Sequence, residues 1–224
     1  MRNLLVICLV FFSLNAFSQK VTNVTGVAYT VSDTEMAATF LENTVDAKVG
    51  VSALIKGESL QRLYGLKDAT LSLKVTPVHI GKELVQLLEF ESSDEGEVIP
   101  ADSRSNDLWF QHIAIVVKDM DQAYTKVRKQ KVEHVSTGPQ ILPDYIPAAA
   151  GIAAFYFRDK DDHNLELIYF PKDKGNPKWK TQSNELFLGI DHTAIGIEDT
   201  DISMAFYKDV LGLKVAGNLS LIHI

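Results

Sequence analysis

Cysteine is nearly absent from this chain of 224 residues, and its single example, Cys8, lies in an apolar run near the N-terminus. A chain cleaved after that run contains no cysteine, which excludes disulfides, thiolate zinc sites and cysteine nucleophiles. Basic charge is also scarce, since 22 Lys and Arg residues face 29 Asp and Glu residues and leave a net charge of −7. Because no basic surface is available to neutralise a phosphate backbone, we expect no nucleic-acid partner.

Long hydrophobic segments are missing as well. The apolar run LLVICLVFFSL at positions 4–14 is too short for a membrane-spanning helix, which needs about 20 apolar residues. It follows the positive charge of Arg2 and precedes small residues, which is the pattern of a secretory signal peptide. We therefore expect residues 1–19 to be a signal peptide and the mature protein to be secreted or periplasmic, with no membrane association after cleavage. The remaining composition, 46% hydrophobic and 23% charged, is that of a globular protein.

The chain repeats one unit more than twice. Residues 112–121, HIAIVVKDMD, match residues 192–201, HTAIGIEDTD, at five of ten positions and at an offset of 80 residues. Residues 26–35, GVAYTVSDTE, form a fainter third copy. Each copy has a β-branched run, then an acidic residue suited to a helix cap, then apolar residues at helical spacing. The sequence therefore predicts three strand–helix pairs, with the helices at 34–45, 120–131 and 200–211.

Further extended stretches complete the first two units, so that each reads as a strand, a helix and three strands. These strands are expected at 49–55, 69–77 and 83–90, and at 132–137, 152–158 and 165–170. The domain boundaries that follow are a first module at 20–96, a linker at 97–107, a second module at 108–171, a linker at 172–188 and the start of a truncated third module at 189–218. The last six residues, LSLIHI at 219–224, are expected to be translated from a sequencing adapter rather than from the native gene.

At this point the chain resembles the vicinal oxygen chelate superfamily, which includes glyoxalase I, bleomycin resistance proteins and extradiol dioxygenases. The resemblance rests on QHIAIVV at 111–117, FYFRDKDDHNLELI at 155–168 and HTAIGI at 192–197, in that order. It implies an α+β fold in which paired βαβββ modules form an eight-stranded, cup-shaped mixed sheet around one metal site. In such families the metal ligands come from the first and last strands of each module.

Carried over residue by residue, the resemblance implies that the metal ligands in the first two modules are Gln86, His112 and Glu166. The first module offers Gly26 at its first-strand position, so one of the usual four ligands is missing. Strand alternation agrees, because His112 and Glu166 fall on the faces that the helices should leave uncovered. His192 is expected to begin a second, incomplete site. The implied cofactor is a divalent ion, Fe, Mn, Zn or Ni, and Glu166 is also the candidate catalytic carboxylate.

Two functions and a combination of them stay open at the level of the sequence. The first is an exported metalloenzyme, a lyase, isomerase or dioxygenase, that acts on a small molecule with vicinal oxygens. The second is a non-catalytic small-molecule-binding module whose metal site is degenerate. The combination makes the first module pair structural and assigns the chemistry to a second pair that begins with His192. Tyr145 is a candidate substrate contact or a packing residue, and Arg158 either binds an anionic substrate or pairs with Asp159. Self-association of the chain also stays open.

Overall fold

The computed structural model describes residues 21–68, 70–92, 96, 99–104 and 106–217. The expected signal peptide at 1–19 and the expected adapter-derived segment at 219–224 lie outside these residues. Among the described residues, no helix has the length and apolar character that crossing a bilayer requires. These residues divide into two compact units, one of 25–199 and one that combines 21–24 with 200–217.

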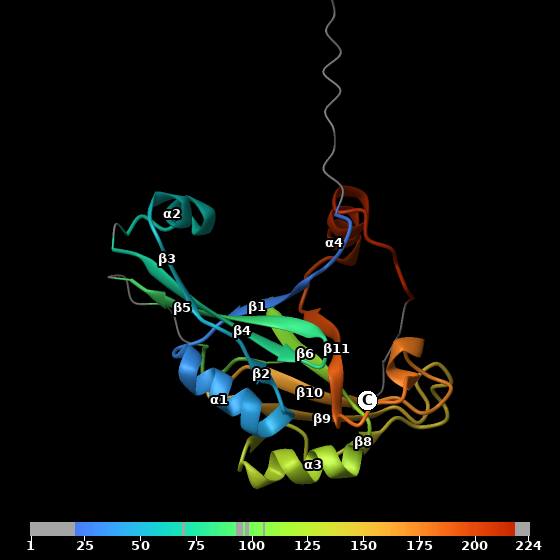
Figure 1. The fold of residues 1–224 in the computed structure, drawn as a ribbon. Coiled ribbons are helices and arrows are strands. Elements are labelled where there is room, and N and C mark those ends of the chain that lie inside the picture. Colours follow the sequence, from blue (N-terminus) through green and yellow to red (C-terminus); the bar gives the residue numbers. More distant parts are fainter. Residues whose placement is uncertain (1–20, 69, 93–95, 97–98, 105, 218–224) are drawn as a thin grey trace, which may run out of the picture. The chain divides into compact units, whose positions relative to one another are not determined.

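The first module forms a mixed sheet with one long helix against it (Figure 1). Its elements are β1 (Gly26–Thr30), α1 (Thr34–Val45), β2 (Lys48–Val49), β3 (Ala53–Lys56), α2 (Glu58–Tyr64), β4 (Ser72–Ile80) and β5 (Glu83–Glu91). The strand order is β1-β5-β4-β2 with β3 beside β4, and only the β1–β5 pair is parallel. Helix α1 begins where the Asp33 carboxylate accepts hydrogen bonds from the backbone N–H groups of Glu35 and Met36.

The second module repeats this arrangement. Its elements are β6 (Phe110–Val117), α3 (Met120–Lys129), β7 (Glu133–His134), β8 (Gln140–Ile141), β9 (Ala153–Arg158) and β10 (Asn164–Tyr169). The first and last strands, β6 and β10, again pair in parallel, and Asp119 caps α3 as Asp33 caps α1. The predicted α+β fold is therefore confirmed.

The third copy of the strand motif becomes the edge strand of the second sheet. Strand β11 (Phe187–Ile195) pairs antiparallel with β6, giving the order β11-β6-β10-β9-β7 with β8 beside β9. The described strands thus form two sheets, of five and six strands, where the sequence led us to expect one eight-stranded sheet. The region 172–188, expected as a linker, contains the short 3-10 helix η1 (Pro177–Lys180) and the start of β11. The other unit contains α4 (Thr200–Met204) and the π-helical turn η2 (Ala205–Val210).

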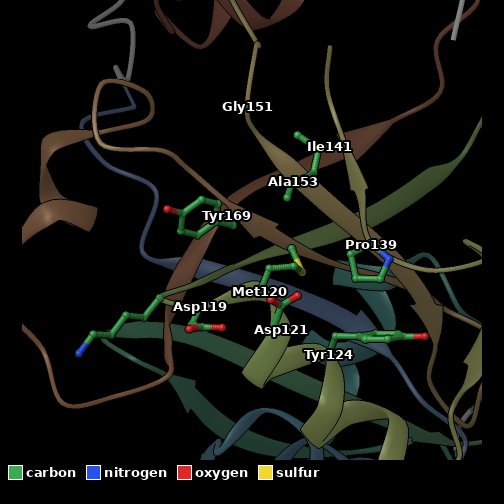
Figure 2. Close-up of a pocket in the computed structure, with 10 residues that line it drawn as sticks. Asp119, Met120, Asp121, Tyr124, Pro139, Ile141, Gly151, Ala153 and Tyr169 are labelled. Carbon is green, nitrogen blue, oxygen red and sulfur yellow. The ribbon is translucent and has the colours of Figure 1, made fainter. Parts of the chain in front are cut away.

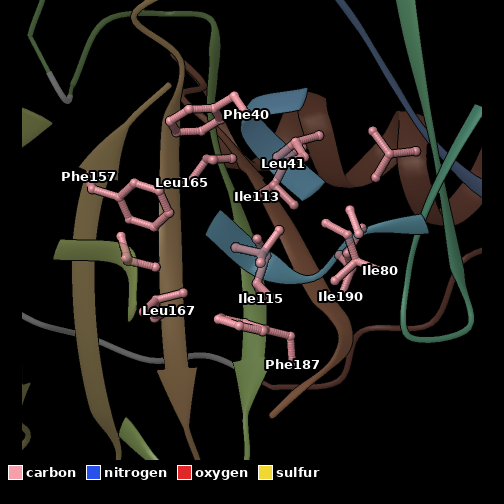
Figure 3. Packing of buried hydrophobic residues seen from close by; sticks show 14 of the residues in the cluster. Phe40, Leu41, Ile80, Ile113, Ile115, Phe157, Leu165, Leu167, Phe187 and Ile190 are labelled. Atoms are coloured by element: carbon pink, nitrogen blue, oxygen red, sulfur yellow. The ribbon is translucent and has the colours of Figure 1, made fainter. Parts of the chain in front are cut away.

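One hydrophobic core joins both modules and β11. Alternate residues of each central strand point toward helices α1 and α3, and Figure 3 shows side chains from α1, β6, β9, β10 and β11 in contact. Phe187 and Ile190 of β11 are 2% and 7% exposed within this core. Strand β11 is therefore held by apolar packing as well as by its backbone pairing with β6.

A glycine lets the β4–β5 turn approach β11. Gly81 has a positive φ of 59°, and a Cβ built on it would lie 2.0 Å from the carbonyl oxygen of Leu188. Any larger residue would push the turn away from β11. The first module thus helps to fix the position of the strand that extends the second sheet.

The β9–β10 turn forms a second junction between the modules. The His163 ring contacts Tyr29 of β1 edge to face at 4.9 Å, and its Nδ1 lies 3.0 Å from an Asp159 carboxylate oxygen. Burial lowers the pKa of His163, but the hydrogen bond and charge of Asp159, together with the charges of Asp161 and Asp162, outweigh burial and hold that pKa above its ordinary value.

A group whose pKa is raised on folding stabilises the fold at low pH and loses that effect as pH rises through the folded pKa. We therefore expect the stability difference between the wild type and His163→Gln to be full below about pH 6.5, the ordinary histidine pKa, and to shrink at higher pH. Urea unfolding between pH 5 and 9 measures it. His79→Gln, at an exposed histidine of β4, is the control and should follow the wild type. A difference that stays constant or grows with pH would contradict the assignment.

Leu167 of β10 is 0% exposed and lies in the shared core. Leu167→Ala should lower the free energy of unfolding by about 2–5 kcal/mol, because it removes buried apolar atoms and leaves a cavity. Denaturant unfolding measures the loss. Leu54→Ala on β3, where 57% of the side chain is exposed, should change stability by less than about 0.5 kcal/mol. Equal losses in the two variants would show that the core is not where the structure places it.

Candidate metal centre

Three neighbouring strands bring Glu166 and His192 into one row. In the registers of these strands, Glu166 of β10 and His192 of β11 both lie opposite Ala114 of β6. Residues opposite one another in adjacent strands point to the same face of a sheet. His112 is the next residue along β6 that points to that face. The methyl side chain of Ala114 leaves room for these three larger groups to converge.

An irregularity in β11 is required for this row. The β6–β11 register shifts between Ile190 and His192, with Asp191 as the extra residue. Ile190 faces the core, and strict alternation would have placed His192 there as well. The bulge instead turns His192 to the opposite face, toward Glu166.

The three side chains meet at their polar atoms. Glu166 Oε2 lies 3.1 Å from Nε2 of His112 and 3.6 Å from Nε2 of His192, and the two Nε2 atoms are 3.3 Å apart. One ligand atom from each residue falls within 4.8 Å of the others. The side chains of His112 and Glu166 are 11% and 4% exposed, whereas that of His192 is 43% exposed. The cluster is therefore buried on one side and accessible on the other.

Each histidine has a partner for its outer nitrogen. Nδ1 of His112 lies 3.4 Å from Oε1 of Gln111, and Nδ1 of His192 lies 3.0 Å from an Asp191 carboxylate oxygen. The other Asp191 oxygen accepts a hydrogen bond of 2.7 Å from the indole N–H of Trp179. Such partners fix the ring orientation and would leave each Nε2 lone pair toward the centre once an ion is bound, as in metal-binding histidines.

The charges around His192 favour its protonated form when no ion is bound. The hydrogen bond to Asp191 raises the pKa of His192 most, Glu166 acts in the same direction, and burial opposes both. Burial works against ionisation of Asp191, but its bonds to His192 and Trp179 prevail and hold the Asp191 pKa below its ordinary value. A metal ion would take the place of the proton, so binding of the ion should strengthen as pH rises.

The chemistry of this donor set fits a divalent ion. Glu166 Oε2 is buried and has no hydrogen-bond partner among the described residues, although both Nε2 atoms lie close to it. A buried carboxylate oxygen needs a compensating charge or donor, and a cation bound by all three residues would supply it. Two imidazoles and one carboxylate are a common set for zinc and for non-haem iron.

Tyr156 is a site residue that sequence reasoning missed. In the β9–β10 register it lies opposite Glu166, and its ring contacts that of His112 edge to face at 5.2 Å. Burial and the charge of Glu166 raise the pKa of Tyr156, so its hydroxyl keeps its proton at neutral pH. The alternation that selected Glu166 would also have selected Tyr156, had the β9–β10 register been known.

The other predicted site residues lie elsewhere. Gln86 is exposed on β5 of the first sheet, whereas the three clustered side chains belong to the second sheet, so its assignment as a ligand stays a prediction. Tyr145 is 74% exposed in the loop before β9. Arg158 lies on the same face as Glu166 and pairs with Glu133 at 3.1 Å, not with its neighbour Asp159. His192 does not stand apart as a second site, because it lies beside His112 and Glu166.

A large cavity of the second module opens on the other face of the sheet. It has a volume of about 530 Å³. Figure 2 shows Met120, Ala153 and Tyr169 in its wall, near the start of α3. Ala153 and Tyr169 alternate with Ala154 and Ile168, whose side chains lie on the same face as Glu166. This cavity therefore does not reach the His–Glu–His cluster.

Comparison with known proteins places this chain in a family. The model of the Glyoxalase/Bleomycin resistance protein/Dioxygenase superfamily matches residues 24–167. A 2-epi-5-epi-valiolone epimerase from an Actinomyces species is 28% identical over 148 residues, which cover 65% of this chain and 78% of the epimerase.

Solved structures support the same fold. A glyoxalase family protein from Bacillus cereus matches with a TM-score of 0.55 and 17% identity, covering 68% of this chain and 97% of that protein. Glyoxalase I from Zea mays matches with a TM-score of 0.54 and 14% identity, covering 84% of this chain and 54% of the maize protein. At these identities the likeness concerns the fold alone.

The cluster predicts the metal stoichiometry of the full chain. After loading with Zn²⁺ or Mn²⁺ and dialysis, we expect about one ion per chain by elemental analysis, and at least a 10- to 100-fold weaker affinity in Glu166→Gln and in His192→Ala. His79→Ala replaces an exposed histidine of the first sheet and should bind the ion as the wild type does. If His192→Ala retained wild-type affinity, β11 would not contribute to the site.

Proposed function

Because the chain belongs to the Glyoxalase/Bleomycin resistance protein/Dioxygenase superfamily, we propose that it is a metal-dependent enzyme that acts on a small molecule with two neighbouring oxygen atoms. His112, Glu166 and His192 would hold the ion. The observation that carries this proposal is the buried Glu166 Oε2, which lies between two imidazole nitrogens and has no hydrogen-bond partner among the described residues.

Each residue of the site has a separate task. A bound divalent ion would polarise the substrate's oxygens and stabilise negative charge that develops on them. His192 borders the exposed side, through which a substrate can approach. Tyr156 faces the same centre and carries a proton that it can donate to a substrate oxygen. Ile168, 7% exposed on the ligand face of β10, helps to keep water from the buried side.

Two reaction classes have support. The epimerase relative favours proton transfer at a carbon next to a carbonyl, as in an isomerase or epimerase. The two-histidine, one-carboxylate donor set favours an oxygenase, since this set with open positions is typical of non-haem Fe(II) enzymes. In both classes the ion would bind the vicinal oxygens of the substrate, and the two classes differ in whether molecular oxygen is consumed.

We also propose that the enzyme works outside the cytoplasm, on the support of the signal-like residues 1–19. The identity of the metal depends on which of the two reaction classes the enzyme catalyses. Zinc, manganese or nickel would serve an isomerase, and iron would serve an oxygenase. In the non-catalytic alternative, the protein would bind an ion or a small molecule without converting it.

Tyr156→Phe tests the catalytic part of the proposal. The variant keeps the ring that packs on His112 but loses the hydroxyl proton, so metal content should stay near one ion while kcat falls roughly 100- to 10,000-fold. Tyr64→Phe, at an exposed tyrosine of α2 in the first module, is the matched control and should retain activity. A Tyr156→Phe enzyme with undiminished kcat would remove Tyr156 from the mechanism.

Two assays on the reconstituted full chain separate the reaction classes. Exchange of carbon-bound hydrogen for deuterium from D₂O, in cyclic hydroxyketones, is expected for an isomerase. Oxygen uptake with catechols after anaerobic loading with Fe²⁺ is expected for an oxygenase. A fully loaded protein inactive in both assays across a panel of such substrates would favour the non-catalytic binding module.

A further inference from the structure

A second cavity, of about 380 Å³, is lined by residues that neighbour His112 along β6 and across the β6–β10 pair. We call it the Arg158 cavity, and its wall includes Arg104, Trp109, Phe110, Arg158, His163 and Asn164. Phe110 and Gln111, which also lines it, immediately precede the ligand His112 on β6. The cavity therefore lies next to His112 along β6, although none of the three clustered residues lines it.

Strand register places the floor of the Arg158 cavity on the same face as the metal ligands. Asn164 lies opposite both Arg158 of β9 and His112 of β6, one inward-facing position before Glu166. Two residues along a strand span about 6.6 Å. A molecule with its oxygens at Glu166 can thus reach Arg158 with a group on its far side, across the width of a six-membered ring.

The polar groups of this floor are not fully satisfied. Arg158 Nη1 pairs with Glu133, whose side chain is 61% exposed, while Arg158 Nε and Asn164 Oδ1 are buried and have no hydrogen-bond partner among the described residues. The Arg158 side chain is 37% exposed and lines the cavity, so part of it is accessible there. A planar guanidinium with spare donors is suited to a carboxylate.

Charge and shape agree with an anionic ring compound. The lining carries the fixed positive charges of Arg104 and Arg158 and the carboxylate of Asp162, in a chain whose net charge is −7. From outside the lining, Glu133 pairs with Arg158 and Asp159 pairs with His163. The Trp109 and Phe110 side chains are 38% and 37% exposed, which leaves aromatic surface for a ring to pack against.

We propose that the substrate is a six-membered ring compound that carries vicinal oxygens on one side and a carboxylate on the opposite side, and that Arg158 binds this carboxylate. This inference rests on the proposed function for the role of the vicinal oxygens. The recognition of the carboxylate by Arg158 does not depend on a bound metal, so the two can be tested apart.

The test uses the full chain treated with a chelator, with benzoate as the probe and benzamide as its neutral counterpart. Ligand-observed NMR titration should show benzoate binding at least tenfold more tightly than benzamide. Arg158→Gln should weaken benzoate binding roughly tenfold or more, because a charge-assisted pair is lost. Arg128→Gln, at an exposed arginine of α3, is the matched control and should bind as the wild type does.

Two further variants guard against a folding defect. Arg158→Lys keeps the positive charge and should recover part of the affinity, and Trp109→Leu, at a partly exposed position, should weaken both probes without altering the circular dichroism spectrum. Equal binding of benzoate and benzamide, or undiminished binding by Arg158→Gln, would overturn the proposal.

Metal analysis of the same variants keeps the two proposals distinguishable. Arg158→Gln should still bind one divalent ion, since Arg158 is not among the three clustered residues. Normal metal binding without Arg158-dependent benzoate binding would reject the carboxylate site alone. Arg158-dependent benzoate binding in a chain that never retains metal would reject the proposed metalloenzyme and leave the carboxylate site standing.

Discussion

The buried Glu166 carboxylate is the group on which the rest of the site depends. It lies within the second sheet at 3% exposure, where an isolated negative charge would be strongly unfavourable. Two imidazoles face it, and one of them is held by Asp191 and, through Asp191, by the Trp179 indole. This sequence of contacts runs from a buried tryptophan to a single carboxylate oxygen. It has the organisation expected of a preformed cation site.

The position of β11 links this site to the fold as a whole. Phe187 and Ile190 pack into the core shared by both modules, and Gly81 allows the β4–β5 turn to lie against Leu188. His192 then reaches Glu166 because a bulge at Asp191 changes the face to which the strand presents its side chains. Apolar packing thus sets the position of β11, and the bulge at Asp191 sets the direction in which His192 points.

Local signals made much of the fold predictable from sequence. The acidic caps and apolar spacing gave helix α1 its predicted bounds, Thr34–Val45, because capping depends on neighbouring residues alone. Strand alternation placed His112 and Glu166 on one face for the same reason. Helix α2 was not predicted, because the seven residues between Gly57 and Gly65 are too few to show apolar residues at helical spacing.

The pairing of distant segments was not predictable in the same way. His192 was assigned to a separate site because nothing local shows that β11 pairs with β6 rather than with strands of its own module. Tyr156 was missed because its role depends on the register of β9 with β10.

X-ray absorption spectroscopy of the zinc-loaded full chain tests the central claim most directly, because it reports the number and type of ligand atoms around the ion. The account predicts two imidazole nitrogens and at least one carboxylate oxygen at about 2.0–2.2 Å, with one imidazole lost in His192→Ala. A spectrum with a single imidazole in the wild type, or one unchanged in His192→Ala, would contradict it.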